Sequence, residues 1–195
     1  MSAIQGFGVV TIEVGSVSRE DGAIRLELSG TDLALNLSSR SSWPSSQVGY
    51  IKGRLKLIKD KNNGNGTVDL SLHMTLASKY WQTGGFITPS QFSLTQAEYG
   101  CEIFTVDAQK QWKYEYYTPA TAVAYGEWHT TKIELMPNTF ELRFYLDDKL
   151  FGQHMPMDAN ELKSMKLTAQ IGIYTSGKYG HVVAYADDAI VTAVP

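Results

Sequence analysis

The chain has 195 residues, of which 43% are hydrophobic and 19% are charged, and its formal net charge is −3. This length and composition predict one globular domain over residues 1–195 and exclude a disordered chain. The acidic balance argues against a nucleic-acid-binding protein, which usually carries a basic excess. No apolar run approaches the ~20 residues that cross a bilayer, so no transmembrane segment is expected.

The first eight residues have neither a basic stretch nor a long apolar run, so no signal peptide is visible. A cytoplasmic protein, a virion-associated protein or a trimmed extracellular domain fits this pattern. Cys101 is the single cysteine, which excludes an intramolecular disulfide. A buried, inert thiol is the expected state of this residue.

The first half of the chain alternates between apolar and polar residues with a period of two, which is typical of half-buried strands. The pattern covers 23–28 and 33–37. In 50–57 it puts Ile51, Leu55 and Leu57 on one face and Lys52, Arg54 and Lys56 on the other. Two Asn-Gly steps in 62–66 predict a hairpin turn, with 68–76 as the partner strand of 50–57.

Three further hairpins are predicted in the second half of the chain. Their strand pairs are 100–106 with 111–117, 128–135 with 139–146, and 167–174 with 181–191. The only predicted helix lies in 157–165, where Asp158 is a plausible N-cap and Glu161 has the capping-box spacing. Many short strands with turn residues between them predict an all-β fold, an antiparallel sandwich or barrel with one short helix.

Five segments in order resemble the strands of concanavalin A-like domains. They are Gly22-Ala-Ile-Arg-Leu26, Trp128-His-Thr-Thr-Lys-Ile-Glu-Leu135, Phe140 to Lys149, Ile171-Gly-Ile-Tyr174 and Tyr185-Ala-Asp-Asp-Ala-Ile-Val191. The resemblance implies a jelly roll of two curved antiparallel sheets, with a concave face that often holds carbohydrate. The family includes lectins, glycoside hydrolases, polysaccharide lyases and structural modules, so the resemblance does not fix a function.

Aromatic residues supply the candidate ligand-binding site, because sugar rings present C–H faces to aromatic rings. Trp112, Tyr114 and Tyr116 alternate along one predicted strand and should therefore point the same way. We also expect Tyr80, Trp81 and Tyr117 to be exposed. The alternative is that the stripe of three forms one side of the core, with Lys113 and Glu115 facing solvent.

An enzymatic reading needs two carboxylates that face one cleft. Residues 100–106 resemble the catalytic strand of laminarinase-type glucanases, which carries Glu-x-Asp-x-x-Glu. Glu102 matches the first position, but Phe104 replaces the Asp and Asp107 takes the last position. The candidate pair is therefore Glu102 with Glu98 or Asp107, and an isolated surface glutamate is the alternative.

The resemblance also implies one structural calcium ion, held by an Asp of the closing strand and by carbonyl oxygens near the N-terminus. Asp187 and Asp188 match the Asp-Asp pair of that strand. Since adjacent strand residues point to opposite faces, only one of the two is well placed to ligate a metal. In the alternative, both residues only accept backbone hydrogen bonds.

The leading interpretation is a non-catalytic module that recognises carbohydrate or another surface. Its partner would be an oligosaccharide, a polysaccharide or the surface of a protein assembly. Two alternatives remain: a structural or decorating component of a virion or other assembly, and a glycoside hydrolase or polysaccharide lyase.

Overall fold

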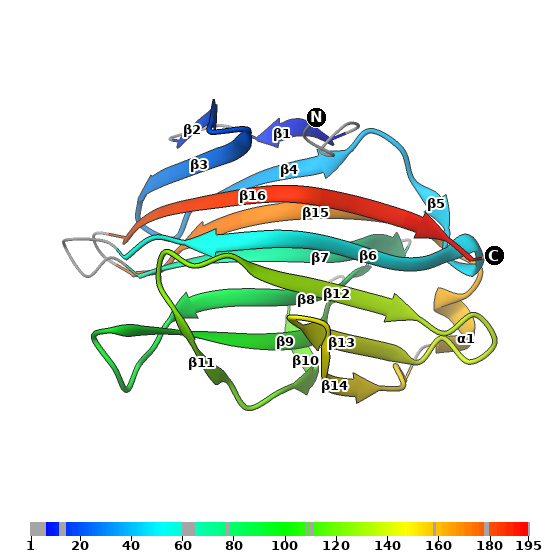
Figure 1. The fold of residues 1–195 in the computed structure, drawn as a ribbon. Coiled ribbons are helices and arrows are strands. Elements are labelled where there is room, and N and C mark those ends of the chain that lie inside the picture. Colours follow the sequence, from blue (N-terminus) through cyan, green and yellow to red (C-terminus); the bar gives the residue numbers. More distant parts are fainter. Residues whose placement is uncertain are drawn as a thin grey trace.

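The computed structural model describes residues 7–11, 15–59, 65–76, 79–107, 109, 111–157, 159–177 and 180–194. Strands occupy most of this part of the chain and form two antiparallel sheets that lie face to face (Figure 1). The predicted two-sheet antiparallel sandwich is therefore confirmed. None of the helices in the described residues is long and apolar enough to cross a membrane.

The first sheet contains nine strands of the described chain, seven of them in one continuous order. In that order the strands are β1 (Phe7–Thr11), β4 (Ala34–Ser39), β15 (Lys166–Thr175), β7 (Gly66–Leu76), β8 (Lys79–Pro89), β9 (Gln96–Val106) and β10 (Trp112–Tyr117). Two short strands complete it: β11 (Thr121–Ala124) pairs with β9, and β5 (Trp43–Pro44) pairs with β15.

The second sheet contains seven strands of the described chain. In spatial order they are β14 (Lys149–His154), β13 (Leu142–Leu146), β12 (His129–Leu135), β6 (Val48–Leu57), β16 (Gly180–Ala193), β3 (Ala23–Gly30) and β2 (Gly15–Glu20). A 3₁₀ turn, η1 (Ser45–Gln47), precedes β6.

The helix predicted in 157–165 is present but shorter, as α1 (Ala159–Leu162). Two backbone hydrogen bonds of the i to i−3 type follow it: Ser164 N donates to Glu161 O and Met165 N donates to Leu162 O, both at 3.1 Å. The predicted N-cap, Asp158, lies outside the described residues.

The core lies between the two sheets and follows from the alternation in the sequence. On β6, Ile51, Leu55 and Leu57 are buried, while Lys52 and Arg54 remain partly exposed on the outer face. On β7, Val68, Leu70, Leu72 and Met74 point inward in the same way. Each such aliphatic side chain stabilises the fold by about 1.5–3 kcal/mol when fully buried.

The predicted hairpin between 50–57 and 68–76 is wrong. β6 pairs with β12 and β16 in the second sheet, whereas β7 pairs with β8 and β15 in the first. The two strands instead pack their apolar faces against each other across the sandwich, so that Leu70 lies over Gly53. The expected turn residues 60–64 lie outside the described part of the chain.

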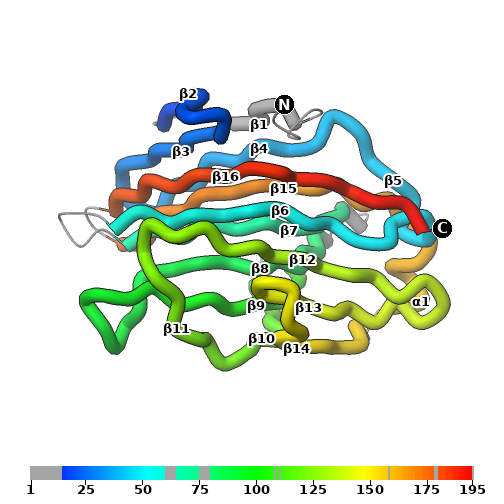
Figure 2. Tube along the Cα trace, viewed as in Figure 1, coloured from blue at the N-terminus to red at the C-terminus, as the bar shows by residue number. Residues whose placement is uncertain are grey.

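The predicted pairing of 167–174 with 181–191 is also wrong, because these two strands belong to different sheets. β15 pairs with β4 and β7, and β16 pairs with β3 and β6, so the chain changes sheet between them (Figure 2). The other two hairpins are confirmed, as β9 with β10 and β12 with β13. Crossing between sheets allows each strand to bury one apolar face in the common core.

Candidate functional site

A groove of about 630 Å³ runs across the outer face of the nine-stranded sheet. Strand alternation places its lining: the residues between the inward-facing ones of β7, such as Asp69 and His73, point outward into the groove. β8 and β9 contribute Gln82 and Glu102 in the same way, and β10 closes one side with Trp112. The volume is in the range of small-molecule and cofactor sites.

One wall of the groove is aromatic. The Phe104 ring centre lies 4.9 Å from that of Trp112, 5.8 Å from that of Tyr114 and 6.2 Å from that of Tyr80. Phe104 is buried beneath this group, whereas Trp112 is 62% exposed. The expectation that Trp112 and Tyr114 point the same way is therefore confirmed, and the alternative that Trp112 belongs to the core is wrong.

A β-bulge on β10 turns Tyr116 away from this wall. Tyr114 pairs with Phe104, but Tyr116 pairs with Ile103, so the register shifts by one residue between them. Tyr116 stacks on Phe144 and His154, at 5.8 and 4.7 Å between ring centres. The predicted stripe of three is therefore wrong for Tyr116, because the inserted residue reverses the alternation.

The same bulge brings Tyr117 to the groove. Its ring centre lies 5.9 Å from that of Phe86, and its side chain is 55% exposed, as expected. Tyr80 also lines the groove and donates a hydrogen bond to Gln82 Oε1 at 2.6 Å. Tyr80 and Tyr117, both predicted as ligand-site residues, therefore line the same groove as Trp112.

Trp81 lies in the core, so the expectation that it is exposed is wrong. It is 0% exposed, and its ring centre is 6.3 Å from that of Phe140. The physical reason is alternation on β8: since Tyr80 and Gln82 face the groove, the residue between them must face the opposite sheet.

Polar side chains form the floor of the groove. Asp69 is 4% exposed, and its Oδ2 accepts a hydrogen bond from Gln82 Nε2 at 3.4 Å. A side-chain carbon on Gly172 would lie 2.5 Å from Asp69 Oδ1 and 2.6–2.7 Å from oxygens of Tyr174 and Asn36. Only glycine allows this floor to close over the β15 backbone.

Two buried polar atoms of this floor have no hydrogen-bond partner among the described residues. They are Asn36 Oδ1 and His73 Nε2. Buried polar groups in folded proteins are nearly always paired, so a cluster of unpaired ones marks a place where another molecule or water completes the bonding. The sequence analysis missed these residues, although the polar face of 68–74 alternates with its apolar face.

Two carboxyl groups line the groove, and neither has a cationic partner within the described part of the chain. Burial raises the pKa of Asp69 from 3.8 to about 7. Burial raises the pKa of Glu102 from 4.5 to about 7, and the nearby Asp69 carboxyl adds to this rise. β8 runs between the two strands that carry these residues, and Gly84, which pairs with Glu102, leaves the space between the carboxyl groups open.

The other two predicted acids, Glu98 and Asp107, are not among the described residues that line the groove. Glu98 accepts a hydrogen bond from Ser90 Oγ at the start of the β8–β9 turn. Asp107 Oδ1 accepts hydrogen bonds from Gln109 N at 2.9 Å and Gln111 N at 2.8 Å, and so caps the β9–β10 turn. The pairing of Glu102 with Glu98 or Asp107 stays a prediction, and the second acid of the described groove lining is Asp69.

Cys101 faces the core beneath the groove and is buried, as expected. Burial raises the pKa of its thiol to about 12, and Thr118 Oγ1 lies 3.4 Å from its sulfur. A thiol in this state is not a nucleophile.

The candidate calcium ligands lie on β16, in the other sheet. Asp187 Oδ1 accepts a hydrogen bond from Asp188 N at 2.9 Å, and Asp188 forms an ion pair with Arg54 at 3.4 Å. No group of three His, Cys, Asp or Glu side chains within the described residues is arranged to hold a metal. These carboxylates thus already serve the protein's own bonding, and calcium binding here stays a prediction.

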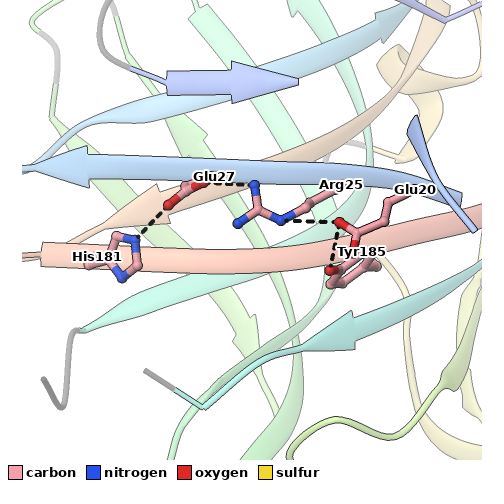
Figure 3. Close-up of polar contacts among 5 residues, drawn as sticks. All are labelled: Glu20, Arg25, Glu27, His181 and Tyr185. Atoms are coloured by element: carbon pink, nitrogen blue, oxygen red, sulfur yellow. Dashed lines mark hydrogen bonds and ion pairs between the residues drawn. The ribbon is translucent and has the colours of Figure 1, made fainter. Parts of the chain in front are cut away.

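The outer face of the seven-stranded sheet carries charges that are paired with one another. Arg25 Nη1 lies 2.7 Å from Glu27 Oε2, and Arg25 Nε lies 3.5 Å from Glu20 Oε2 (Figure 3). His181 Nε2 lies 3.2 Å from Glu27 Oε1, and Tyr185 donates to Glu20 at 3.1 Å. Residues from β2, β3 and β16 thus complete one another's bonding.

The basic strand face of β6 belongs to this outer surface. Lys52 pairs with Asp148 at 3.0 Å, and Lys56 Nζ lies over the rings of Trp128 and Tyr185, at 4.7 and 4.3 Å. Cations held by aromatic rings and carboxylates are typical of a self-contained solvated face.

No family model matches the chain, and no curated protein matches it in sequence. Solved structures do match it. A glycoside hydrolase family 16 endo-glucanase from Bacteroides ovatus has a TM-score of 0.63 at 13% identity, covering 96% of this chain and 95% of that one. The chain has the concanavalin A-like jelly-roll fold.

Two other jelly rolls show the range of proteins that share this fold. A legume lectin-like domain from Entamoeba histolytica gives a TM-score of 0.62 at 12% identity, covering 96% of this chain and 91% of that one. The carbohydrate-binding module CBM66 from Bacillus subtilis gives 0.59 at 14% identity, covering 96% and 99%. At such low identity these similarities establish the fold alone.

Proposed function

We propose that the chain is a non-catalytic carbohydrate-recognition module that binds a sugar chain in the groove of the nine-stranded sheet. The observation that carries this proposal is the opposition, within one groove, of an exposed aromatic wall and a floor of unpaired polar atoms. Sugars need both features at once, since each ring has apolar C–H faces and hydroxyl groups around its edge.

The aromatic wall supplies the apolar half of such a site. Trp112 and Tyr117 keep more than half of their surface exposed, and Phe104 and Phe86 support them from below. Large aromatic side chains left in contact with water at a groove mark a binding surface more often than a structural one. Two platforms along β10 suit a chain of several sugar units.

The non-catalytic part of the proposal rests on what surrounds Glu102. The residue two positions further along β9 is Phe104, which packs in the aromatic wall, and Asp107 is engaged in its own turn. Glu102 is therefore the one acid of β9 among the described residues that line the groove.

A panel of soluble oligosaccharides tests this proposal. We expect binding to at least one glycan, and a loss of about tenfold or more in affinity in Trp112→Ala and Tyr117→Ala, since a stacking aromatic contributes about 1–2 kcal/mol. Trp128→Ala is the matched control, because Trp128 is a half-buried tryptophan on the other sheet. Failure of the folded protein to bind any glycan, or equal losses in the control, would overturn the proposal.

A second candidate, glycoside hydrolysis, is favoured by one observation. Asp69 and Glu102 both line the groove from strands two positions apart, and both pKa values are raised to about 7. A protonated and an ionised carboxyl across a groove are the requirement for acid and base catalysis of glycosidic cleavage. Release of reducing ends from a bound glycan, lost in both Asp69→Asn and Glu102→Gln, would establish this candidate instead of the non-catalytic one.

A further inference from the structure

The charges that line the groove are all of one sign. Among its described lining residues the only acids are Asp69 and Glu102, and none is Lys or Arg. Asp69 is almost completely buried, and burial together with the nearby Asp69 carboxyl raises the pKa of Glu102. A third negative charge placed here would meet two acids in a region from which most water is already excluded.

The lining offers no other cation to compensate. His73 is the one histidine of the lining, and burial lowers its pKa from 6.5 to about 4, so it is neutral at physiological pH. By strand alternation Lys166 lies on the same face of the sheet, and Arg40 follows the end of β4; both are exposed and lie outside the groove lining.

The remaining titratable groups that face the two acids are phenols. Burial raises the pKa of each of them, so they stay uncharged through neutral pH; they are Tyr80, Tyr114, Tyr117 and Tyr174. Phenols and amides donate hydrogen bonds to hydroxyl groups without favouring an anion as a guanidinium does.

We propose that the groove selects uncharged sugar chains and rejects those that carry carboxylate or sulfate groups. This inference rests on the proposed function and names its ligand class. Its physical basis is that like charges brought together at an interface impose a repulsive cost on the wrong ligand, while hydroxyl groups satisfy the unpaired acceptors of the floor.

The experiment compares glycans of matched backbone with and without sulfate, such as dextran and dextran sulfate oligosaccharides, or carrageenan oligosaccharides before and after chemical desulfation. Alginate and heparin oligosaccharides extend the anionic arm, and cello-, laminari- and manno-oligosaccharides extend the neutral arm. At pH 8 the wild-type protein should prefer the neutral member of a bound pair by about tenfold or more.

The pH dependence of this preference identifies the groups responsible. Sulfate stays ionised throughout, so a change between pH 5 and pH 8 reports the protein's acids. Since the pKa values of Asp69 and Glu102 are both about 7, each is largely neutral at pH 5 and largely ionised at pH 8. The preference should shrink at pH 5 and also in an Asp69→Asn, Glu102→Gln double variant, but not in Glu127→Gln, an exposed control outside the groove lining.

Three outcomes separate this inference from the proposed function. Equal or tighter binding of the sulfated member by the wild type at pH 8 would overturn the inference and leave glycan binding intact. A preference that persists unchanged in the double variant would overturn the role of the two acids. Absence of binding to every glycan in both arms would overturn the proposed function, and the inference with it.

Discussion

The two outer faces of the sandwich differ in how their charged and polar groups are paired. On the seven-stranded sheet, Glu27 lies between Arg25 and His181, so each charge faces one of opposite sign (Figure 3). On the nine-stranded sheet, Asp69 and Glu102 line one groove whose described lining contains no Lys or Arg, and Asn36 Oδ1 and His73 Nε2 lack partners among the described residues. The first face pairs its charges within the protein, although His129 Nε2 on β12 lacks a partner among the described residues, and the second face is the one that we propose binds a partner.

The pKa directions express the same difference. A hydrogen bond from Arg25 lowers the pKa of Glu27 and so stabilises its charged form, whereas burial raises the pKa of Glu102 and disfavours its charge. The groove face therefore gives up stability that the other face retains. A local loss of folding stability is expected where a surface serves binding.

The largest expected effect separates Trp81, which lies in the core, from Trp112, which lines the groove. Trp81→Ala should reduce the free energy of unfolding by about 3–5 kcal/mol, because it leaves a cavity in the core against Phe140. Trp112→Ala should cost about 1 kcal/mol or less, since most of that side chain is already exposed. Denaturant unfolding of both variants measures this, and equal losses would contradict the assignment of Trp112 to a binding surface.

The next effect concerns the pH dependence of stability. Because the pKa of Asp69 is higher in the folded protein than in the unfolded chain, the folded state binds more protons and loses stability as the pH rises from about 4 to 8. A rise of the pKa from 3.8 to about 7 corresponds to a loss of up to about 4 kcal/mol for this residue.

Asp69→Asn removes this titration and should make the curve less steep, and the slope that remains belongs to Glu102, whose pKa burial also raises to about 7. Unfolding in urea at several pH values between 4 and 9, on the wild type and the variant, provides the measurement. A wild-type curve that rises over this range, or one that the substitution leaves unchanged, would show that Asp69 is ionised in the folded protein.

Calcium binding would give the seven-stranded sheet a ligand of its own, and so would weaken the contrast between the two outer faces. If Asp187 or Asp188 binds the ion, calcium at tenfold over its dissociation constant should stabilise the protein by about 1.4 kcal/mol and raise the melting temperature. Asp187→Asn should abolish this rise. Identical melting temperatures with calcium and with a chelator would contradict the prediction. The two carboxylates would then serve only the ion pair with Arg54 and the backbone hydrogen bond.

The smallest effect is expected on the paired face. Glu27→Gln weakens an ion pair whose members are both partly exposed, so it should cost no more than about 1 kcal/mol. Since the pKa of Glu27 is lowered in the folded protein, this contribution is present above its ordinary value of 4.5 and disappears as the pH falls below it. Thermal melts of wild type and variant at pH 7 and pH 3 should converge at the lower pH.

The sequence predicts the sandwich because burial of one strand face needs only a period of two, which Ile51, Leu55 and Leu57 display. It does not predict strand partners in the same way. The alternation of 50–57 and 68–76 is the same whether the strands pair edge to edge or pack across the core, and the long-range contact of Leu70 with Gly53 decides between these arrangements.

The candidate site shows a similar division. Trp112, Tyr80, Tyr117 and Glu102 were predicted as candidates and do lie in the groove. Tyr116 was misplaced because a β-bulge leaves no mark in the residue types around it. Trp81 was misplaced because alternation shows that Tyr80 and Trp81 face opposite ways, but does not show which of them faces the core.

The most direct test of the account is to locate a bound sugar. A crystal structure of the protein with a neutral oligosaccharide from the panel should place a sugar ring against Trp112 or Tyr117, with hydroxyl groups directed at the floor that Asp69 and Asn36 form. A sugar bound instead on the outer face of the seven-stranded sheet, beside Trp128 and Tyr185, would contradict the division of the molecule into a self-contained face and a binding face.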